Sequence, residues 1–151
     1  MKKDEFKKII EFAVDNEVEA YEFYRDAAAK VKDENLKGVF QELAEEELGH
    51  QKFLKGFLTN DVASLELNEV SDYKIAETID KPKLSVDMSF ADAFGLAIKN
   101  EEEAMDMYKN LANACIEEEQ KKLFLELSKM EKMHKARLEE IYLNVAYAEV
   151  W

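Results

Sequence analysis

Residues 36–57 read LKGVFQELAEEELGHQKFLKGF, and the pattern within them decides the fold. Apolar residues recur with alternating steps of four and three, which is typical of a helix packed inside a bundle. Glu47 and His50 fall on this apolar seam, where polar side chains are unusual. The stretch therefore predicts a buried helix face that carries one carboxylate and one imidazole. The whole seam comprises Leu36, Phe40, Leu43, Glu47, His50, Leu54 and Phe57.

The same seam recurs in three other segments, and only four glycines and one proline interrupt the chain. We predict one all-α domain, residues 1–151, with helices over about 4–31, 35–58, 89–115 and 118–147. Short turns join the helices within each pair, whereas a long crossover over about 59–88 joins the two pairs. Two antiparallel hairpins linked in this way predict a four-helix bundle of up-down-down-up topology.

The two predicted hairpins are related by an internal repeat of 84 positions. Both histidines of the chain follow a glutamate by three residues, and both pairs occupy equivalent seam positions. Chance seldom produces such agreement, so we interpret the hairpins as pseudo-symmetric copies. Under the shift Phe6 falls on Phe90, Glu17 on Glu101, Tyr24 on Tyr108, Glu47 on Glu131 and His50 on His134.

Glutamate and histidine three residues apart lie on one face of a helix, about one turn from each other. A single ion can therefore take an oxygen of Glu47 and a nitrogen of His50 together. Glu17 precedes Glu47 by 30 positions, and antiparallel helices place residues equally far from their turn at equal height. Each seam glutamate then stands roughly 22 Å from its turn. We predict that six metal ligands meet in one layer: Glu17, Glu47, His50, Glu101, Glu131 and His134.

Four carboxylates buried in one layer would repel each other and would carry a large desolvation penalty. Two divalent cations would balance their charge, with the two histidines as neutral ligands. Mixed carboxylate and imidazole ligation suits iron or manganese, and zinc also accepts these ligand types. The sequence therefore predicts a two-metal site, with two iron ions as the leading choice and manganese or a mixed pair as alternatives.

These motifs resemble the rubrerythrin and bacterioferritin branch of the ferritin-like di-iron carboxylate superfamily, over both hairpins. The family pattern is Glu, Glu-x-x-His, Glu, Glu-x-x-His, with a tyrosine two turns after the first glutamate, as Tyr24 and Tyr108 are here. The resemblance implies that Glu47 and Glu131 bridge the metal ions. It also implies a non-haem di-iron protein that oxidises Fe(II) with peroxide or dioxygen, in oxidative-stress defence or iron handling.

The chain departs from the family pattern at several points. Ala104 stands where rubrerythrins carry an additional metal-binding glutamate, which puts the redox-linked iron movement proposed for them in doubt. The sequence contains no rubredoxin module, so we expect an electron donor in trans. Leu48 replaces the haem-binding methionine of bacterioferritins, and the residues after Val145 leave no room for the fifth helix of ferritin cages. We expect no haem and no storage shell, and a homodimer is one expectation because relatives often dimerise.

The amino-acid composition limits which binding partners and which cellular compartment we expect. The formal net charge of -13 disfavours nucleic acid and anionic membrane surfaces, and no apolar run is long enough to span a bilayer. The single cysteine, Cys115, can form neither an internal disulfide nor a thiolate metal site, and its seam position predicts a buried thiol. We expect a cytoplasmic protein that binds cations as its ligands.

Other interpretations of these residues stay open. Tyr24 and Tyr108 suit either a plain core role, with each hydroxyl bonded to a buried carboxylate, or a catalytic role beside the metals. At the level of function, the alternatives are a non-catalytic iron or manganese buffer and a metal-free structural bundle. Four glutamates beside the seam are expected on solvated faces: Glu45, Glu46, Glu102 and Glu103.

Overall fold

The computed structural model describes residues 2–58, 82–145 and 150–151. Within these residues the chain forms four α-helices and no strand, so the all-α prediction is confirmed. The helices are α1 (Lys3–Lys30), α2 (Glu34–Gly56), α3 (Phe90–Ala114) and α4 (Glu118–Val145). Their ends lie within two residues of the predicted ones, and most of the predicted crossover lies outside the described residues. None of the described helices is long and apolar enough to cross a membrane.

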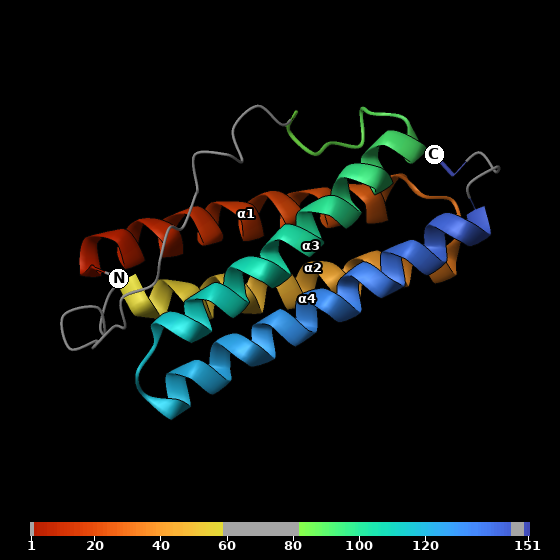
Figure 1. Cartoon of the computed structure of the whole chain (residues 1–151). Helices are drawn as coiled ribbons and strands as arrows, with labels where there is room; N and C mark the ends of the chain where they lie inside the picture. Colours follow the sequence, from red (N-terminus) through yellow and green to blue (C-terminus); the bar gives the residue numbers. More distant parts are fainter. Residues whose placement is uncertain (1, 59–81, 146–149) are drawn as a thin grey trace.

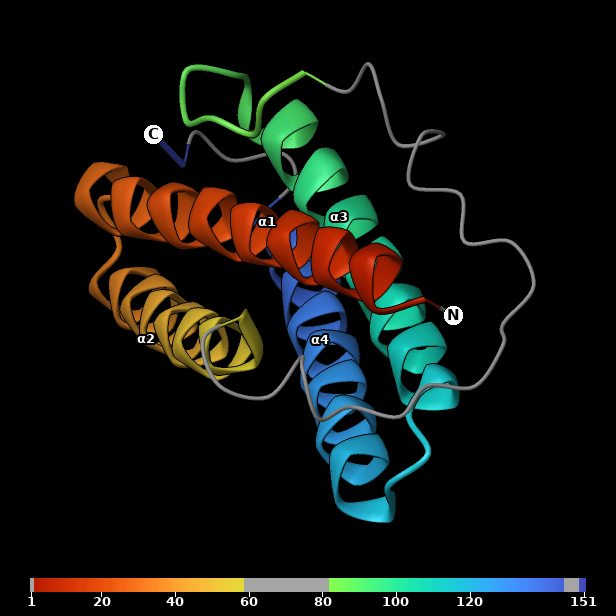
Figure 2. The same cartoon turned by 90° about the vertical axis from the view of Figure 1, so that its left-hand side faces the viewer.

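Two antiparallel hairpins make up the bundle, α1 with α2 and α3 with α4 (Figure 1). Figures 1 and 2 show that the second hairpin crosses the first at an oblique angle. Helix α1 lies against α3, and α2 is joined to α4 by contacts such as Arg137 Nη2 to Glu42 Oε2 at 2.9 Å. The crossing therefore brings the middle of each helix toward a common region.

Side-chain caps explain where two of the helices begin. Asp33 Oδ1 accepts N–H hydrogen bonds from Asn35 at 2.7 Å and from Leu36 at 3.3 Å at the start of α2. Ser89 Oγ accepts the N–H of Asp92 at 3.2 Å at the start of α3. Such a cap pairs otherwise unsatisfied N–H groups and contributes on the order of 1 kcal/mol. The caps fix where each helix starts and thus which residues face the bundle interior.

The apolar core consists of two clusters with a polar layer between them. In the first cluster the rings of Phe6 and Phe124 meet edge to face, with centroids 6.1 Å apart. In the second, Phe40 and Phe94 meet in the same way at 5.7 Å. Cys115 lies buried in the first cluster, as predicted. Close-packed aromatic side chains thus wall the polar layer on both sides and hold its backbone in place.

Candidate metal centre

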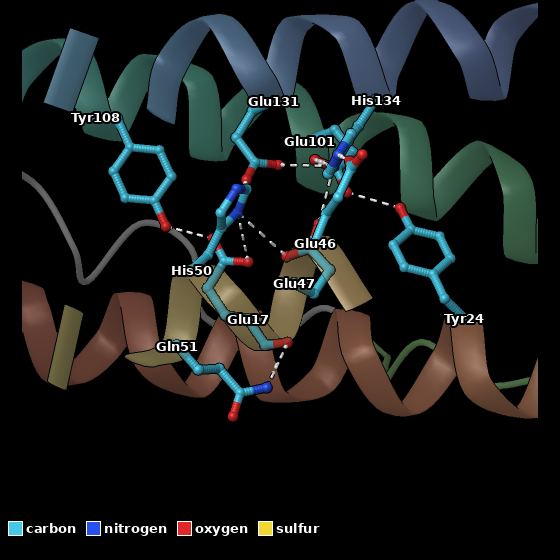
Figure 3. A network of polar contacts seen from close by, with 10 residues as sticks. All are labelled: Glu17, Tyr24, Glu46, Glu47, His50, Gln51, Glu101, Tyr108, Glu131 and His134. Carbon is cyan, nitrogen blue, oxygen red and sulfur yellow. Dashed lines mark hydrogen bonds and ion pairs between the residues drawn. The ribbon is translucent and has the colours of Figure 1, made fainter. Parts of the chain in front are cut away.

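The six residues predicted as ligands meet in the polar layer between the two apolar clusters (Figure 3). Helices α1 and α3 each contribute one glutamate, and α2 and α4 each contribute a glutamate and a histidine three residues later. All six are buried, with exposed fractions between 0% and 7%. The structure thus brings together Glu17, Glu47, His50, Glu101, Glu131 and His134.

The six side chains form two overlapping groups of four, each with one histidine. One group holds Glu17, Glu47, His50 and Glu131, and the other holds Glu47, Glu101, Glu131 and His134. Within each group one ligand atom per residue lies within 4.8 Å of the others, which is close enough to surround one ion. Glu47 and Glu131 belong to both groups, so each carboxylate lies between the two positions.

Each histidine faces the shared glutamate of the opposite hairpin. His50 Nδ1 lies 3.0 Å from Glu131 Oε1, and His134 Nδ1 lies 2.9 Å from Glu47 Oε1. The two imidazole rings are nearly parallel, with an interplanar angle of 16° and centroids 5.8 Å apart. Neither half of the site is therefore complete within one hairpin, and assembly of the bundle creates both.

Many buried atoms of this layer make no hydrogen bond of good geometry among the described residues, although four of them form the two close nitrogen–oxygen pairs described above. They include both oxygens of Glu47, one oxygen of each other glutamate in the layer, and Nδ1 of both histidines. Burying a polar atom without a partner costs about 1–3 kcal/mol, and more when the group is charged. Carboxylate oxygens and imidazole nitrogens are the ligands that iron and manganese accept in helical bundles. The residues present therefore fit a metal centre of the di-iron carboxylate kind.

The carboxylates of the layer shift each other's pKa values. Burial, together with the charges of Glu101 and Glu17, raises the pKa of Glu131 well above its ordinary value. Burial also acts to raise the pKa of Glu101, but its interactions with Glu131 and His134 outweigh that effect and lower it. Four charged carboxylates in this buried layer are therefore unfavourable without a compensating charge. Bound cations would supply that charge and would neutralise the layer.

Two tyrosines connect the hairpins through the layer. Tyr24 on α1 donates its hydroxyl hydrogen to Glu101 Oε1 at 2.7 Å, and Tyr108 on α3 donates to Glu17 Oε1. Figure 3 shows the two rings at opposite ends of the cluster. Burial and the neighbouring carboxylates raise the pKa of both phenols, so both stay protonated as donors. Each tyrosine holds one oxygen of a glutamate and leaves the other oxygen for a metal ion.

Glu46 was wrongly predicted to lie on a solvated face. Its side chain is 31% exposed, and Oε2 pairs with Nε2 of His134 across the hairpin boundary. A carboxylate at Nε2 fixes the orientation of the imidazole and leaves Nδ1 directed at the other carboxylates. One feature of the sequence could have indicated this role. Glu46 departs from the internal repeat, because the shift of 84 positions pairs it with Met130.

The other residues beside the seam contribute less to the layer. Glu45 and Glu102 are exposed, as predicted, whereas Glu103 is half-buried and not on a fully solvated face as predicted. Gln51, which no sequence pattern singled out, is buried and donates from Nε2 to the backbone oxygen of Glu17 at 3.4 Å. This contact fastens α2 to α1 next to two of the ligating positions.

The rubrerythrin family model matches residues 8–142, a range that contains all six residues of the layer. The chain belongs to the rubrerythrin family. Among solved structures, this rubrerythrin-family chain is similar to a hypothetical protein from Pyrococcus furiosus, at 28% identity and a TM-score of 0.73. The similarity covers 96% of this chain and 92% of that one. Among curated proteins nothing matches. The predicted family and the predicted four-helix bundle are thus both confirmed.

Position 104 carries no carboxylate in this member of the rubrerythrin family. Ala104 is half-buried and packs against the first apolar cluster, and its pseudo-symmetric counterpart Ala20 is half-buried as well. A methyl group offers no ligand atom to a metal ion. A metal ion therefore finds no carboxylate ligand at this position to which it could move.

Proposed function

We propose that the protein binds two iron ions in the polar layer and reacts Fe(II) with peroxide or dioxygen. The observation that carries this proposal is the pair of overlapping donor groups that share Glu47 and Glu131. Two shared carboxylates with one histidine on each side suit two neighbouring divalent ions, whose charges four glutamates balance. Manganese or a mixed pair fits the same ligands. In the cell this reaction would serve oxidative-stress defence or iron handling.

Bound iron would supply the electrons that reduce peroxide or dioxygen. The chain itself binds, orients and shields: Tyr24 and Tyr108 orient two of the glutamates and keep a proton on each phenol oxygen. The apolar clusters on both sides limit the access of water. With one cysteine the chain cannot build a rubredoxin centre, so we infer that an electron donor acts in trans.

Iron binding and turnover test the proposal in two steps. Anaerobic titration of the metal-free protein with Fe(II) should saturate at about two ions per chain. Exposure to dioxygen or peroxide should then oxidise the bound iron. The double variant His50→Ala with His134→Ala should bind far less iron, while a control with two exposed changes, Glu45→Ala with Glu102→Ala, should bind as the wild type does. Unchanged binding in the histidine variant would refute the site.

Repeated peroxide reduction with a supplied electron donor separates catalysis from storage. A catalyst consumes many equivalents of peroxide per chain, whereas an iron or manganese buffer oxidises its metal once and then stops. A metal-free structural bundle is disfavoured because seven atoms of the layer are buried without hydrogen-bond partners among the described residues. Such a bundle would contain no metal after purification and would show a melting temperature that chelators do not change.

A further inference from the structure

A cavity of about 220 Å³ that opens to the surface lies beside His50, between α2 and α4. Of the six residues in the polar layer, only His50 lines it. One water molecule occupies roughly 30 Å³ in the liquid, so the cavity can take a diatomic or a similarly small molecule. Its lining combines one imidazole, four apolar side chains and one glutamate, namely His50, Phe53, Leu123, Glu126, Leu127 and Met130.

The pseudo-symmetric place beside His134 carries charged contacts instead of apolar side chains. There Arg137 Nη2 donates to Glu42 Oε2 at 2.9 Å, and Glu46 Oε2 pairs with Nε2 of His134. Both contacts join α2 to α4 near His134, and the Arg137–Glu42 pair is exposed. The counterparts of the cavity lining, 84 positions away, are His134, Arg137, Val39, Glu42, Leu43 and Glu46.

Two residue differences distinguish the side of the layer beside His50 from the side beside His134. Phe53 occupies the place of Arg137, and Met130 occupies the place of Glu46. Neither phenylalanine nor methionine can form an ion pair, so the charged contacts near His134 cannot form at His50. Both side chains also make the cavity apolar, while Glu126 and the net charge of -13 disfavour anions. The chemistry of the cavity therefore favours a small uncharged guest.

We propose that this cavity admits a small uncharged molecule of the size of dioxygen to the polar layer. The donor group around His50 is then the position at which the small molecule arrives, whereas charged contacts lie near the group around His134. This inference rests on the proposed function and adds to it the position at which the substrate arrives. It also makes the two halves of a pseudo-symmetric site unequal in reactivity.

Nitric oxide tests the route because it is uncharged, similar in size to dioxygen, and binds Fe(II) without needing turnover. Leu123 lines the cavity and is 41% exposed, so Leu123→Trp can fill the cavity without disturbing the core. The control at the pseudo-symmetric position is Val39→Trp; because Val39 is half-buried against the second apolar cluster, its melting temperature and iron content are measured as well. In anaerobic stopped-flow measurements on iron-loaded protein, Leu123→Trp should lower the nitric oxide association rate at least about tenfold. Val39→Trp should leave that rate within about twofold of the wild type.

Equal rates in the wild type and in Leu123→Trp, at equal iron content, would overturn the proposal. Equal slowing by Leu123→Trp and Val39→Trp would overturn it too, because the two sides would then admit the probe alike. If Leu123→Trp fails to fold, Met130→Phe fills the same cavity from another lining residue. That variant should slow association in the same way.

Xenon tests the cavity without any metal ion. Crystals of the metal-free protein under xenon pressure should show xenon beside His50, and crystals of Leu123→Trp should show none there. Absence of xenon from the wild-type cavity would overturn the inference even if iron binds and turns over. Xenon in the cavity of a chain that takes up no iron would instead refute the proposed function and leave the cavity as a binding site for small uncharged molecules.

Discussion

The two hairpins carry the same ligands in the same order but surround them differently. In the polar layer, the α1–α2 hairpin and the α3–α4 hairpin superimpose residue for residue in sequence, 84 positions apart. Around the histidines they diverge, with charged contacts near His134 and an apolar cavity at His50. The polar layer is therefore duplicated, whereas the apolar cavity that leads to it belongs to the His50 half alone among the described residues.

The largest expected effect concerns the carboxylates that both halves share. Glu47→Gln or Glu131→Gln removes a ligand from both donor groups, so iron binding should fall from about two ions per chain to almost none. Glu17→Gln or Glu101→Gln touches one group only and should leave about one ion per chain. Anaerobic Fe(II) titration with elemental analysis measures the difference.

Thermal unfolding of the metal-free variants is the control for these substitutions. Replacing a buried carboxylate by an amide relieves repulsion, so the metal-free Glu131→Gln protein should be at least as stable as the wild type. Equal metal loss in Glu17→Gln and Glu47→Gln would show that the two donor groups do not share their ligands as described.

The next effect distinguishes the two histidines. Glu46→Gln replaces the carboxylate that orients His134, and loss of such a partner weakens metal binding about 10- to 100-fold. Only one of the two binding events should weaken, because His50 has no equivalent partner at Met130. Titration with Co(II), followed by its visible absorption, resolves the two events, and Glu45→Gln is the exposed control on the same helix. Equal weakening of both events would contradict the asymmetry.

The tyrosines should affect the two halves alike. Tyr24→Phe and Tyr108→Phe each leave a buried glutamate oxygen without its donor, which should lower the free energy of unfolding by about 1–3 kcal/mol. Tyr142→Phe, at a half-buried position outside the layer, should change it by less than about 0.5 kcal/mol. Chemical denaturation of the metal-free proteins measures the three values. Markedly different losses for the two layer tyrosines would show that symmetry fails inside the layer as well.

The smallest effect concerns Cys115, whose counterpart in the other hairpin is Val31. Burial raises the pKa of the Cys115 thiol from 9.0 to about 11. The unfolded chain releases this proton first, so the thiol's contribution to stability is complete below pH 9 and is lost as the pH rises toward 11. Relative to Cys115→Val, the wild type should lose about 1 kcal/mol between pH 7 and pH 10. A difference that does not change with pH would show that the thiol is not shielded.

The helices and the six residues of the layer were predictable because both follow from local periodicity. The four-and-three spacing determines which residues of a helix face inward, and the repeat identifies Glu17 and Glu101 as equivalents. Residues equally far from a hairpin turn meet at one height. The members of the layer could therefore be predicted without knowing the angle at which the hairpins cross.

The pairing of Glu46 with His134 was not predictable in the same way. It joins α2 to α4, and which side chains meet across two hairpins depends on their crossing angle rather than on the period of either helix. The cavity at His50 has the same origin, since it exists where Phe53 and Met130 fail to make contacts that Arg137 and Glu46 make elsewhere. The sequence contains the differences between these residues, but only the packing of the helices shows that they leave a cavity at His50.

Anomalous scattering at the iron edge, from crystals grown anaerobically with Fe(II), tests the two-metal centre most directly. Two iron peaks should appear in the polar layer, one within the donor group of His50 and one within that of His134, with Glu47 and Glu131 in contact with both. A single peak, or peaks only at surface carboxylates, would contradict a two-metal centre built from a duplicated hairpin.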